Sequence, residues 1–302
     1  MVGSGVHGPG PLVTQPVFRF APSPNGRLHL GHAYSALLNA SLAERWQGRF
    51  LLRIEDIDPT RSRPDFEAAI YEDLAWLGLT WEQPVRRQSE HIDDYRAAFR
   101  RLERLGLVYP CFCTRREIAV AVLHREEEMG RRGPRDPDGA PLYPGKCRLF
   151  TAVEIADRMA AGESPAWRID SAKAILAAQR RMHVRCFDLS GAASTREARP
   201  ECWGDAVLVR KDTPTSYHLS VVVDDALQGI THVVRGQDLE PATDLHVLLQ
   251  SLLDLPSPAY HHHELILDEH GAKLAKSAGS EPLAAARARG VSPAEIRGRL
   301  GF

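Results

Sequence analysis

The chain has 302 residues and a formal net charge of −1 at pH 7, and 43% of its residues are hydrophobic and 25% charged. These values are ordinary for a globular protein with two cores or with one core and a large insertion, and they exclude nucleic-acid binding through overall positive charge. No run approaches the ~18 apolar residues of a membrane span, and residues 1–16 lack the pattern of a signal peptide, so we expect no membrane partner and a loose N-terminal tail.

The first third of the chain alternates strands and helices. In chain order we expect a strand at 17–21, a helix at 31–46, a strand at 49–54, helices at 64–77 and 95–105, and a strand that begins at 107–109. This order is typical of an α/β fold with a parallel sheet.

The middle of the chain changes character. Residues 114–146 are charged and rich in proline and glycine, so they cannot form a core alone. We expect a long loop between Cys113 and Tyr143, and because the stretch lies between Cys113 and Cys147 we expect its ends to be tied together. Small polar residues predict a second loop at 185–200. The remaining elements are strand-like runs at 206–210, 220–224 and 232–235, a helix at 244–253 and a last strand at 264–267.

The stretch RFAPSPNGRLHLGH, residues 19–32, joins the first strand to the first helix. The free N–H groups at a helix N-terminus bind anions, and Gly31 lets a ligand approach the backbone. His29 and His32 share one face of the first turn, where they can donate to a phosphate. The alternative is that His29 caps the helix and His32 is a satisfied core histidine.

The stretch RIEDIDPTR, residues 53–61, ends the second strand, where open α/β sheets bind ligands. Glu55 suits an ammonium group, and Arg19 and Arg235 suit two carboxylates. These three charges fit glutamate. The alternative is a local ion-pair network of four residues: Glu55, Asp56, Asp58 and Arg61.

The first stretch resembles the "HIGH" signature of the class I aminoacyl-tRNA synthetases, in the form of their glutamyl and glutaminyl branch. KLAKS, residues 273–277, resembles their second signature, K-M-S-K-S, with Ala275 in place of the central serine. The resemblance implies a Rossmann-like catalytic domain that adenylates glutamate with ATP and Mg²⁺, in which His29, His32 and Lys276 are catalytic.

The same resemblance implies two sets of binding residues. The glutamate site would contain Arg19, Phe20, Ala21, Pro22, Ser23, Glu55, Tyr217 and Arg235. The ATP site would contain His29, His32, Asp238, Lys273 and Lys276. For Tyr217 the alternative is a half-buried aromatic residue of a strand.

Three of the five cysteines, Cys111, Cys113 and Cys147, indicate a metal site in a reducing cytoplasm more than a disulfide framework. Thiolates favour zinc or another soft metal. The candidates for the fourth donor are His124, Tyr143, Cys186, Cys202 and water, and the chemistry alone favours histidine or cysteine over tyrosine. The alternative is three buried free cysteines. The spacing C-x-C…Y-x₃-C resembles the zinc site in the insertion domain of the glutamyl-queuosine tRNA(Asp) synthetases, which implies one structural Zn²⁺ with Tyr143 as fourth ligand.

The chain stops at Phe302, soon after KLAKS, whereas conventional glutamyl-tRNA synthetases continue into an anticodon-binding domain. The resemblance to the truncated group implies a monomer that activates glutamate without tRNA and transfers it to the queuosine base in the anticodon loop of tRNA(Asp). The alternatives are a catalytic fragment that charges the 3′ end of tRNA(Glu), an inactive RNA-binding paralogue and a general nucleotidyltransferase.

The expected divisions of the chain are a flexible tail at 1–16, the halves of the catalytic domain at 17–108 and 206–280, a zinc-containing insertion domain at 109–205 and a short helical segment at 281–302. We expect tRNA contacts from basic clusters, although each alone is more often a solvated face: Arg86–Arg87, Arg100–Arg101–Arg104, Arg115–Arg116 and Arg131–Arg132–Arg135. The run His261–His262–His263 predicts no metal site, but we expect His262 or His263 beside the adenine.

Overall fold

The computed structural model of the chain describes residues 15–179, 182–266 and 281–302. Within these ranges, none of the helices has the length and apolar character needed to cross a bilayer.

The strands of the described residues form three sheets. The first is parallel, in the order β1 (Val17–Phe20), β2 (Arg49–Ile54) and β3 (Glu82–Arg87). The second is mixed, in the order β7 (Ala193–Glu197), β6 (His183–Phe187), β10 (Ala259–His263) and β9 (His232–Gly236). The third is antiparallel, in the order β4 (Val108–Cys111), β5 (Ala166–Ile169) and β8 (Val207–Val209).

Helices cover these sheets and connect them. The α-helices are α1 (Leu30–Arg45), α2 (Pro64–Trp76), α3 (Ile92–Arg104), α4 (Arg115–Met129), α5 (Ala152–Ala160), α6 (Ser171–Ala177), α7 (Tyr217–Leu227), α8 (Ala242–Leu252), α9 (Leu283–Ala288) and α10 (Pro293–Arg299). Short 3₁₀ helices are η1 (Gln88–Glu90), η2 (Lys146–Leu149), η3 (Pro200–Trp203) and η4 (Gln237–Leu239).

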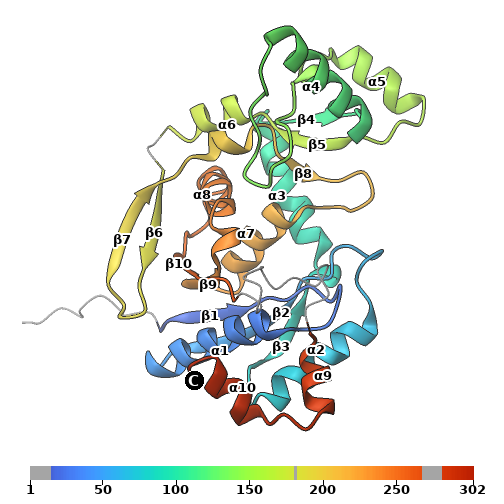
Figure 1. The fold of residues 1–302 in the computed structure, drawn as a ribbon. Coiled ribbons are helices and arrows are strands. Elements are labelled where there is room, and N and C mark those ends of the chain that lie inside the picture. Colours follow the sequence, from blue (N-terminus) through green and yellow to red (C-terminus); the bar gives the residue numbers. More distant parts are fainter. Residues whose placement is uncertain (1–14, 180–181, 267–280) are drawn as a thin grey trace, which may run out of the picture.

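The two sheets of the lower part in Figure 1 meet between β1 and β9, where Thr231 N donates to Val17 O over 3.1 Å. From β1 the chain continues to β2 on one side, and from β9 it continues to β10 on the other side. The carboxyl ends of β1 and β9 therefore form a topological switch point, the place where open α/β sheets bind ligands.

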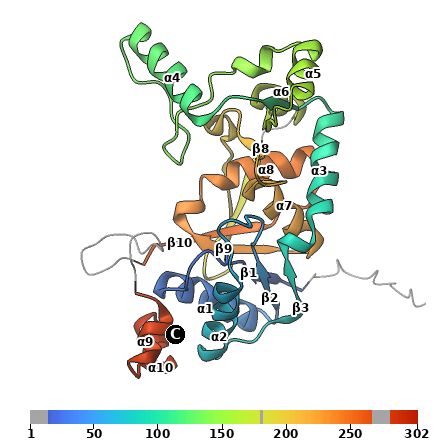
Figure 2. The same cartoon turned by 90° about the vertical axis from the view of Figure 1, so that its right-hand side faces the viewer.

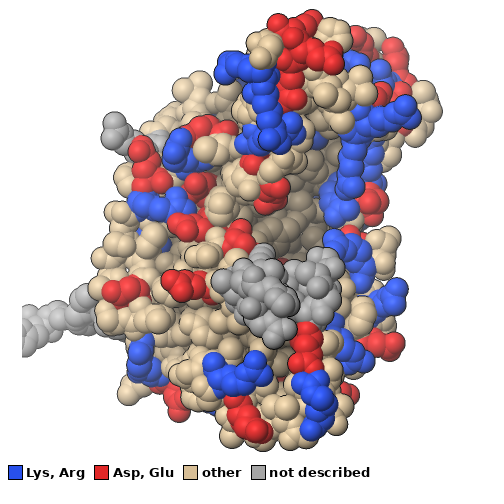
Figure 3. Space-filling model, in the orientation of Figure 1, with Lys and Arg blue, Asp and Glu red and all other residues tan. Residues whose placement is uncertain are grey.

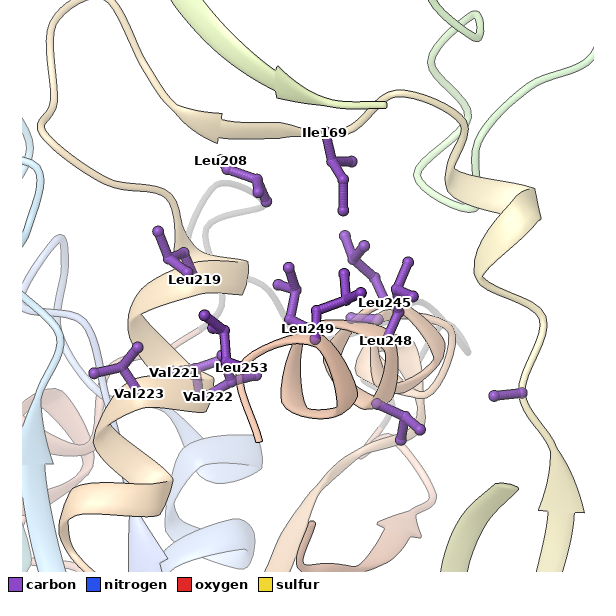
Figure 4. Packing of buried hydrophobic residues seen from close by; sticks show 14 of the residues in the cluster. Ile169, Leu208, Leu219, Val221, Val222, Val223, Leu245, Leu248, Leu249 and Leu253 are labelled. Atoms are coloured by element: carbon purple, nitrogen blue, oxygen red, sulfur yellow. The ribbon is translucent and has the colours of Figure 1, made fainter. Parts of the chain in front are cut away.

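One hydrophobic core joins the lower part to the antiparallel sheet above it. Figure 4 shows Ile169 of β5 and Leu208 of β8 pointing towards the leucines of α8, beside the valines of α7. Leu208 and Leu248 are 0% exposed. Figure 2 shows α3 running between the lower and the upper part. Packing thus fixes the upper sheet to α7 and α8, whose N-terminal ends carry site residues.

The predicted elements of the first third are confirmed, apart from boundaries: the helix expected from residue 95 begins at Ile92. Pro64 occupies the first position of α2, where a missing N–H costs least. The expected strands at 206–210 and 232–235 and the helix at 244–253 are also confirmed within one or two residues.

Three predictions for the middle of the chain are wrong. Residues 115–129, expected without regular structure, form α4, because Thr114 and Glu117 make a capping box at its start. The loop expected at 185–200 is the hairpin of β6 and β7, which turns at Gly191 with φ 93°. Residues 220–224, expected as a strand, lie in α7. The valines of this run are buried on all sides of the helix, so the sequence shows neither the helical nor the strand periodicity of apolar residues.

The C-terminal residues pack against the start of α1. The last strand, expected at 264–267, lies instead at Ala259–His263, and Leu267 is outside the described residues. After the second gap, Leu283 N donates to Leu28 O over 2.8 Å, and Pro282 forms a β-bridge with His29. Pro282 and Leu283 therefore lie beside the first signature.

Candidate active site

A cavity of about 850 Å³ opens at the switch point between β1 and β9. It gathers all the described residues of the two predicted sites, which come from five separate stretches of the chain: Arg19, Phe20, Ala21, Pro22, Ser23, His29, His32, Glu55, Tyr217, Arg235 and Asp238. His263 lines it as well. The predicted residues Lys273 and Lys276, together with Ala275, lie outside the described residues.

The two histidines of the first signature cap α1 and line the cavity at the same time. His29 Nδ1 accepts from Gly31 N over 3.1 Å, and His32 Nδ1 accepts from His29 N over 3.3 Å. A Cβ on Gly31 would lie 3.1 Å from the His29 ring, so glycine leaves room for the cap. Because Nδ1 accepts in both rings, the neutral imidazoles carry their hydrogen on Nε2. Capping, the alternative interpretation of His29, is thus compatible with a place in the cavity.

Arg19 is buried against a carboxylate that the sequence interpretation missed. Its Nε lies 3.1 Å from Asp225 Oδ1, and Arg53 Nη1 lies 2.8 Å from the same oxygen. Arg53 is 0% exposed. Burial opposes ionisation, but Arg19 and Arg53 hold the pKa of Asp225 below its usual value. Asp225 therefore fixes Arg19 at the cavity wall.

Glu55 reaches the same network from β2. Its Oε1 lies 3.3 Å from Arg53 Nη2, and burial raises its pKa despite the neighbouring arginines. Its neighbours have other partners, since Asp56 accepts from Ser89 and Asp58 from Thr60. The stretch from 53 to 61 thus does not form the single local network of the alternative interpretation. A ligand ammonium would stabilise the charged form of Glu55.

Arg235 forms the opposite wall of the cavity. Its guanidinium donates to Tyr217 Oη over 3.0 Å and to Thr243 Oγ1 over 2.7 Å. Tyr217 is the first residue of α7 and not a strand residue. Thr243 was missed because its only signal is a position eight residues after Arg235, directly before the helix predicted at 244–253. Of the two histidines considered for the adenine site, His263 lines the cavity and His262 contacts Arg235 Nε at 3.4 Å.

Asp238 lies at the rim, in η4 directly after β9. A Cβ on Gly236 would lie 2.5 Å from Asp238 Oδ1. The glycine of the RG pair is therefore required for this position of Asp238.

The three clustered cysteines converge at the far end of β4. The sulfur atoms of Cys111, Cys113 and Cys147 all lie within 4.8 Å of one another. Tyr143 Oη is 3.5 Å from Cys113 Sγ and accepts from Cys147 N over 2.9 Å. Of the other donors considered, His124 is exposed on α4, whereas Cys186 lies in β6 and Cys202 in η3.

This donor set fits a metal ion. Burial raises the pKa of Cys113 to about 11, so an apolar pocket alone disfavours its thiolate, whereas a cation would stabilise it. Three soft sulfurs with one oxygen nearby are compatible with a tetrahedral structural zinc site.

One predicted basic cluster is engaged in ion pairs within the protein. Arg86 donates to Asp224 over 2.7 Å and to Asp94 over 2.6 Å, and Arg87 pairs with Glu67 at 2.9 Å. The Arg86 side chain is only 13% exposed, which argues against an RNA contact from this residue, whereas the Arg87 side chain is 39% exposed.

The chain is similar to known tRNA synthetases along nearly its full length. Residues 16–293 match the family of tRNA synthetases class I (E and Q), catalytic domain. The chain is 46% identical to the Glutamyl-Q tRNA(Asp) synthetase of Rhodobacter capsulatus, over 95% of this chain and 100% of that protein. It is 40% identical to the Glutamyl-Q tRNA(Asp) synthetase of Symbiobacterium thermophilum, over 94% of this chain and 85% of that protein.

Longer relatives match over part of their length. The Glutamate–tRNA ligase of Aquifex aeolicus is 39% identical, over 91% of this chain and 54% of that protein. A solved structure of the glutamate-tRNA synthetase of Elizabethkingia anophelis has a TM-score of 0.70 and 28% identity, and the match covers 88% of this chain and 53% of that one. The glutamate tRNA ligase of Elizabethkingia meningosepticum, solved in complex with its amino acid, has a TM-score of 0.69 and 29% identity, over 88% of this chain and 52% of that one. This chain thus spans about half the length of these longer synthetases.

Proposed function

Because this chain belongs to the class I tRNA synthetases for glutamate and glutamine, within the group named Glutamyl-Q tRNA(Asp) synthetases, we propose that it activates L-glutamate with ATP and transfers it to the queuosine base of tRNA(Asp). Membership of the family makes the chain a ligase. The amino acid, the acceptor and the roles of individual residues are the proposal.

One observation carries the choice of glutamate: Arg19, Glu55 and Arg235 line the same cavity. One carboxylate and two guanidiniums complement the ammonium and the two carboxylates of glutamate. The structurally similar glutamate tRNA ligase of Elizabethkingia meningosepticum, which was solved in complex with its amino acid, supports this assignment. A general nucleotidyltransferase would need neither Glu55 nor Arg235.

In the first step, an oxygen of the α-carboxylate of glutamate attacks the α-phosphorus of ATP in line, and pyrophosphate leaves. His29 and His32, together with the N–H groups at the start of α1, stabilise charge on the phosphates, and Asp238 binds the ATP ribose. Lys273 and Lys276 complete the clamp on the leaving pyrophosphate. Bound Mg²⁺ would supply further neutralisation of the phosphate charge. Positioning and electrostatics do nearly all the work.

In the second step, a hydroxyl of the cyclopentene diol of queuosine attacks the acyl carbonyl of glutamyl-adenylate, and AMP leaves. The names of the relatives that match end to end support this acceptor. Exposed arginines offer phosphate contacts around the hollow seen in Figure 3, where Lys and Arg side chains gather along one edge. The exposed members of the predicted clusters are Arg100, Arg104, Arg115, Arg116, Arg131 and Arg132.

Cys111, Cys113, Tyr143 and Cys147 would hold one structural Zn²⁺. The ion would tie the end of β4 to η2 and so close the long excursion that contains α4. The five free thiols support a reducing compartment, the cytoplasm, and we expect the enzyme to act as a monomer.

The test is incubation with ATP, radiolabelled glutamate and tRNA(Asp) that lacks its 3′-terminal adenosine, isolated with or without queuosine. We expect label only on the queuosine-containing tRNA. Label on intact tRNA(Glu) and none on queuosine would support a 3′-charging enzyme instead. Glutamate-dependent ATP–pyrophosphate exchange without tRNA is the companion measurement, and its absence would favour an inactive RNA-binding paralogue.

A further inference from the structure

Arg235 is held by four hydrogen-bond partners on three elements. Its side chain lies almost entirely inside the protein, with 5% of the residue exposed. Nη2 donates to Thr243 Oγ1 over 2.7 Å, and Nη1 donates to Tyr217 Oη over 3.0 Å. Nε lies 3.4 Å from His262 Nε2, and Nη1 lies 3.5 Å from His246 Nδ1. Four of the five N–H groups of Arg235 are therefore oriented by these partners.

All four partners are uncharged. Burial raises the pKa of the Tyr217 phenol, lowers the pKa of His262 to about 2 and lowers that of His246 well below its usual value. Among the described residues, none of the ion pairs includes Arg235. A buried guanidinium without a counter-charge is costly, so its charge remains to be balanced by an anionic group of a ligand.

Thr243 is the central member of this set. It is 0% exposed in the first turn of α8, and it makes the shortest of the four contacts. Since its oxygen accepts from Arg235, its own hydrogen is free to go to His262 Nε2, 3.1 Å away. His262 Nε2 thus accepts from both groups, which fixes its hydrogen on Nδ1. One hydroxyl therefore holds both the arginine fork and the imidazole that supports it.

We propose that Thr243 is a positioning residue for recognition of the substrate carboxylate: it orients Arg235 without neutralising it. The inference rests on the proposed function, because it takes L-glutamate as the anionic ligand. Thr243 itself touches no substrate, and it acts through Arg235. Since Arg19 is already paired with Asp225, the proposal assigns the side-chain carboxylate of glutamate to Arg235. Loss of Thr243 should then weaken binding of glutamate more than binding of glutamine, which lacks that charge.

Two substitutions separate the hydroxyl from the shape of the residue. Thr243→Val keeps the branched shape and loses the hydroxyl, and Thr243→Ser keeps the hydroxyl. Ser220→Ala is the matched control, since Ser220 is also 0% exposed but bonds to the carbonyl groups of Ser216 and Tyr217 in its own helix. The readouts are ATP–pyrophosphate exchange with glutamate or glutamine and calorimetric binding of L-glutamate.

For Thr243→Val we expect the KM for glutamate to rise roughly 10- to 100-fold, the usual effect of losing a hydrogen bond to a charged group. The KM for ATP should stay within about twofold, and the preference for glutamate over glutamine should fall. Thr243→Ser and Ser220→Ala should resemble the unmodified enzyme in all three quantities.

The inference is wrong if Thr243→Val raises both KM values alike, leaves both unchanged, or is matched by an equally impaired Thr243→Ser. If the unmodified enzyme binds glutamate but catalyses no exchange, the proposed function fails, and the glutamate Kd values of the variants still decide the role of Thr243. If the unmodified enzyme does not bind glutamate, both are overturned.

Discussion

The two walls of the cavity hold their arginines in opposite ways. On the β1–β2 side, Arg19 lies against the carboxylate of Asp225, which Arg53 shares, and Arg53 also approaches Glu55 and Asp224. On the β9–β10 side, Arg235 is surrounded by hydroxyl groups and imidazoles. The first arrangement balances its charges inside the protein, and the second leaves a charge to be balanced by a ligand.

The difference indicates a division of labour between stability and recognition. Breaking a buried ion pair leaves an uncompensated charge, whereas losing one neutral acceptor removes a single hydrogen bond. The β1–β2 side should therefore dominate the free energy of unfolding, and the β9–β10 side should dominate the response to an anionic ligand.

The largest effect should come from Asp225→Ala. Removing this carboxylate leaves Arg19 and Arg53 short of a partner in the interior and should lower the free energy of unfolding by about 3–5 kcal/mol. Thr243→Val should cost only about 1–2 kcal/mol, because no charge is uncovered. Urea unfolding of the two variants measures the difference.

The matched control is the pair of Arg49 and Glu82 on the surface, whose side chains are 44% and 42% exposed. Glu82→Ala should change the free energy of unfolding by less than about 1 kcal/mol. Equal losses for Asp225→Ala and Thr243→Val would break the comparison between the two walls.

A smaller effect, on activity rather than stability, is expected from Glu55→Gln. The amide keeps the shape but loses the charge that would meet the ammonium of glutamate, so kcat/KM for glutamate in the exchange reaction should fall roughly 10- to 100-fold. The melting temperature should stay level or rise, because burial already disfavours the charged carboxylate. A falling melting temperature with unchanged kinetics would make Glu55 a structural partner of Arg53 instead.

The sequence predicted those site residues that lie in recognisable motifs and missed those whose roles depend on contacts with residues elsewhere in the chain. Residues 19–32 and Arg235 lie in motifs with their own spacing, and the cavity brings them together as expected. Asp225 and Thr243 could not be found in this way, because their roles depend on contacts across 206 and 8 residues. Asp225 also directly follows a run taken for a strand, whereas in the structure it belongs to α7 and contacts Arg19 and Arg53. Local patterns identify the residues that meet a ligand more readily than those that hold them.

The effect expected to be smallest at neutral pH concerns the β9–β10 side, because it develops only as the pH falls below 6.5. Burial lowers the pKa of His218 to about 4 and that of His262 to about 2, both below the usual value of 6.5. The unfolded chain therefore binds more protons in acid, so stability is full above pH 6.5 and falls as the pH falls towards these values. His218 Nδ1 lies 3.2 Å from His246 Nε2, and Arg235 beside this pair further opposes its protonation. Each such histidine adds up to about 1.4 kcal/mol per pH unit to the slope of the free energy of unfolding against pH.

For His218→Gln, unfolding measured between pH 4 and 6.5 should show a shallower dependence of the free energy of unfolding on pH, by about one proton. His124→Gln, on the exposed face of α4, is the matched control for replacing a histidine at the surface. If His218→Gln left the pH dependence of the free energy of unfolding unchanged, a proton would be tolerated next to Arg235. The guanidinium of Arg235 would then not require uncharged neighbours, contrary to the comparison drawn above.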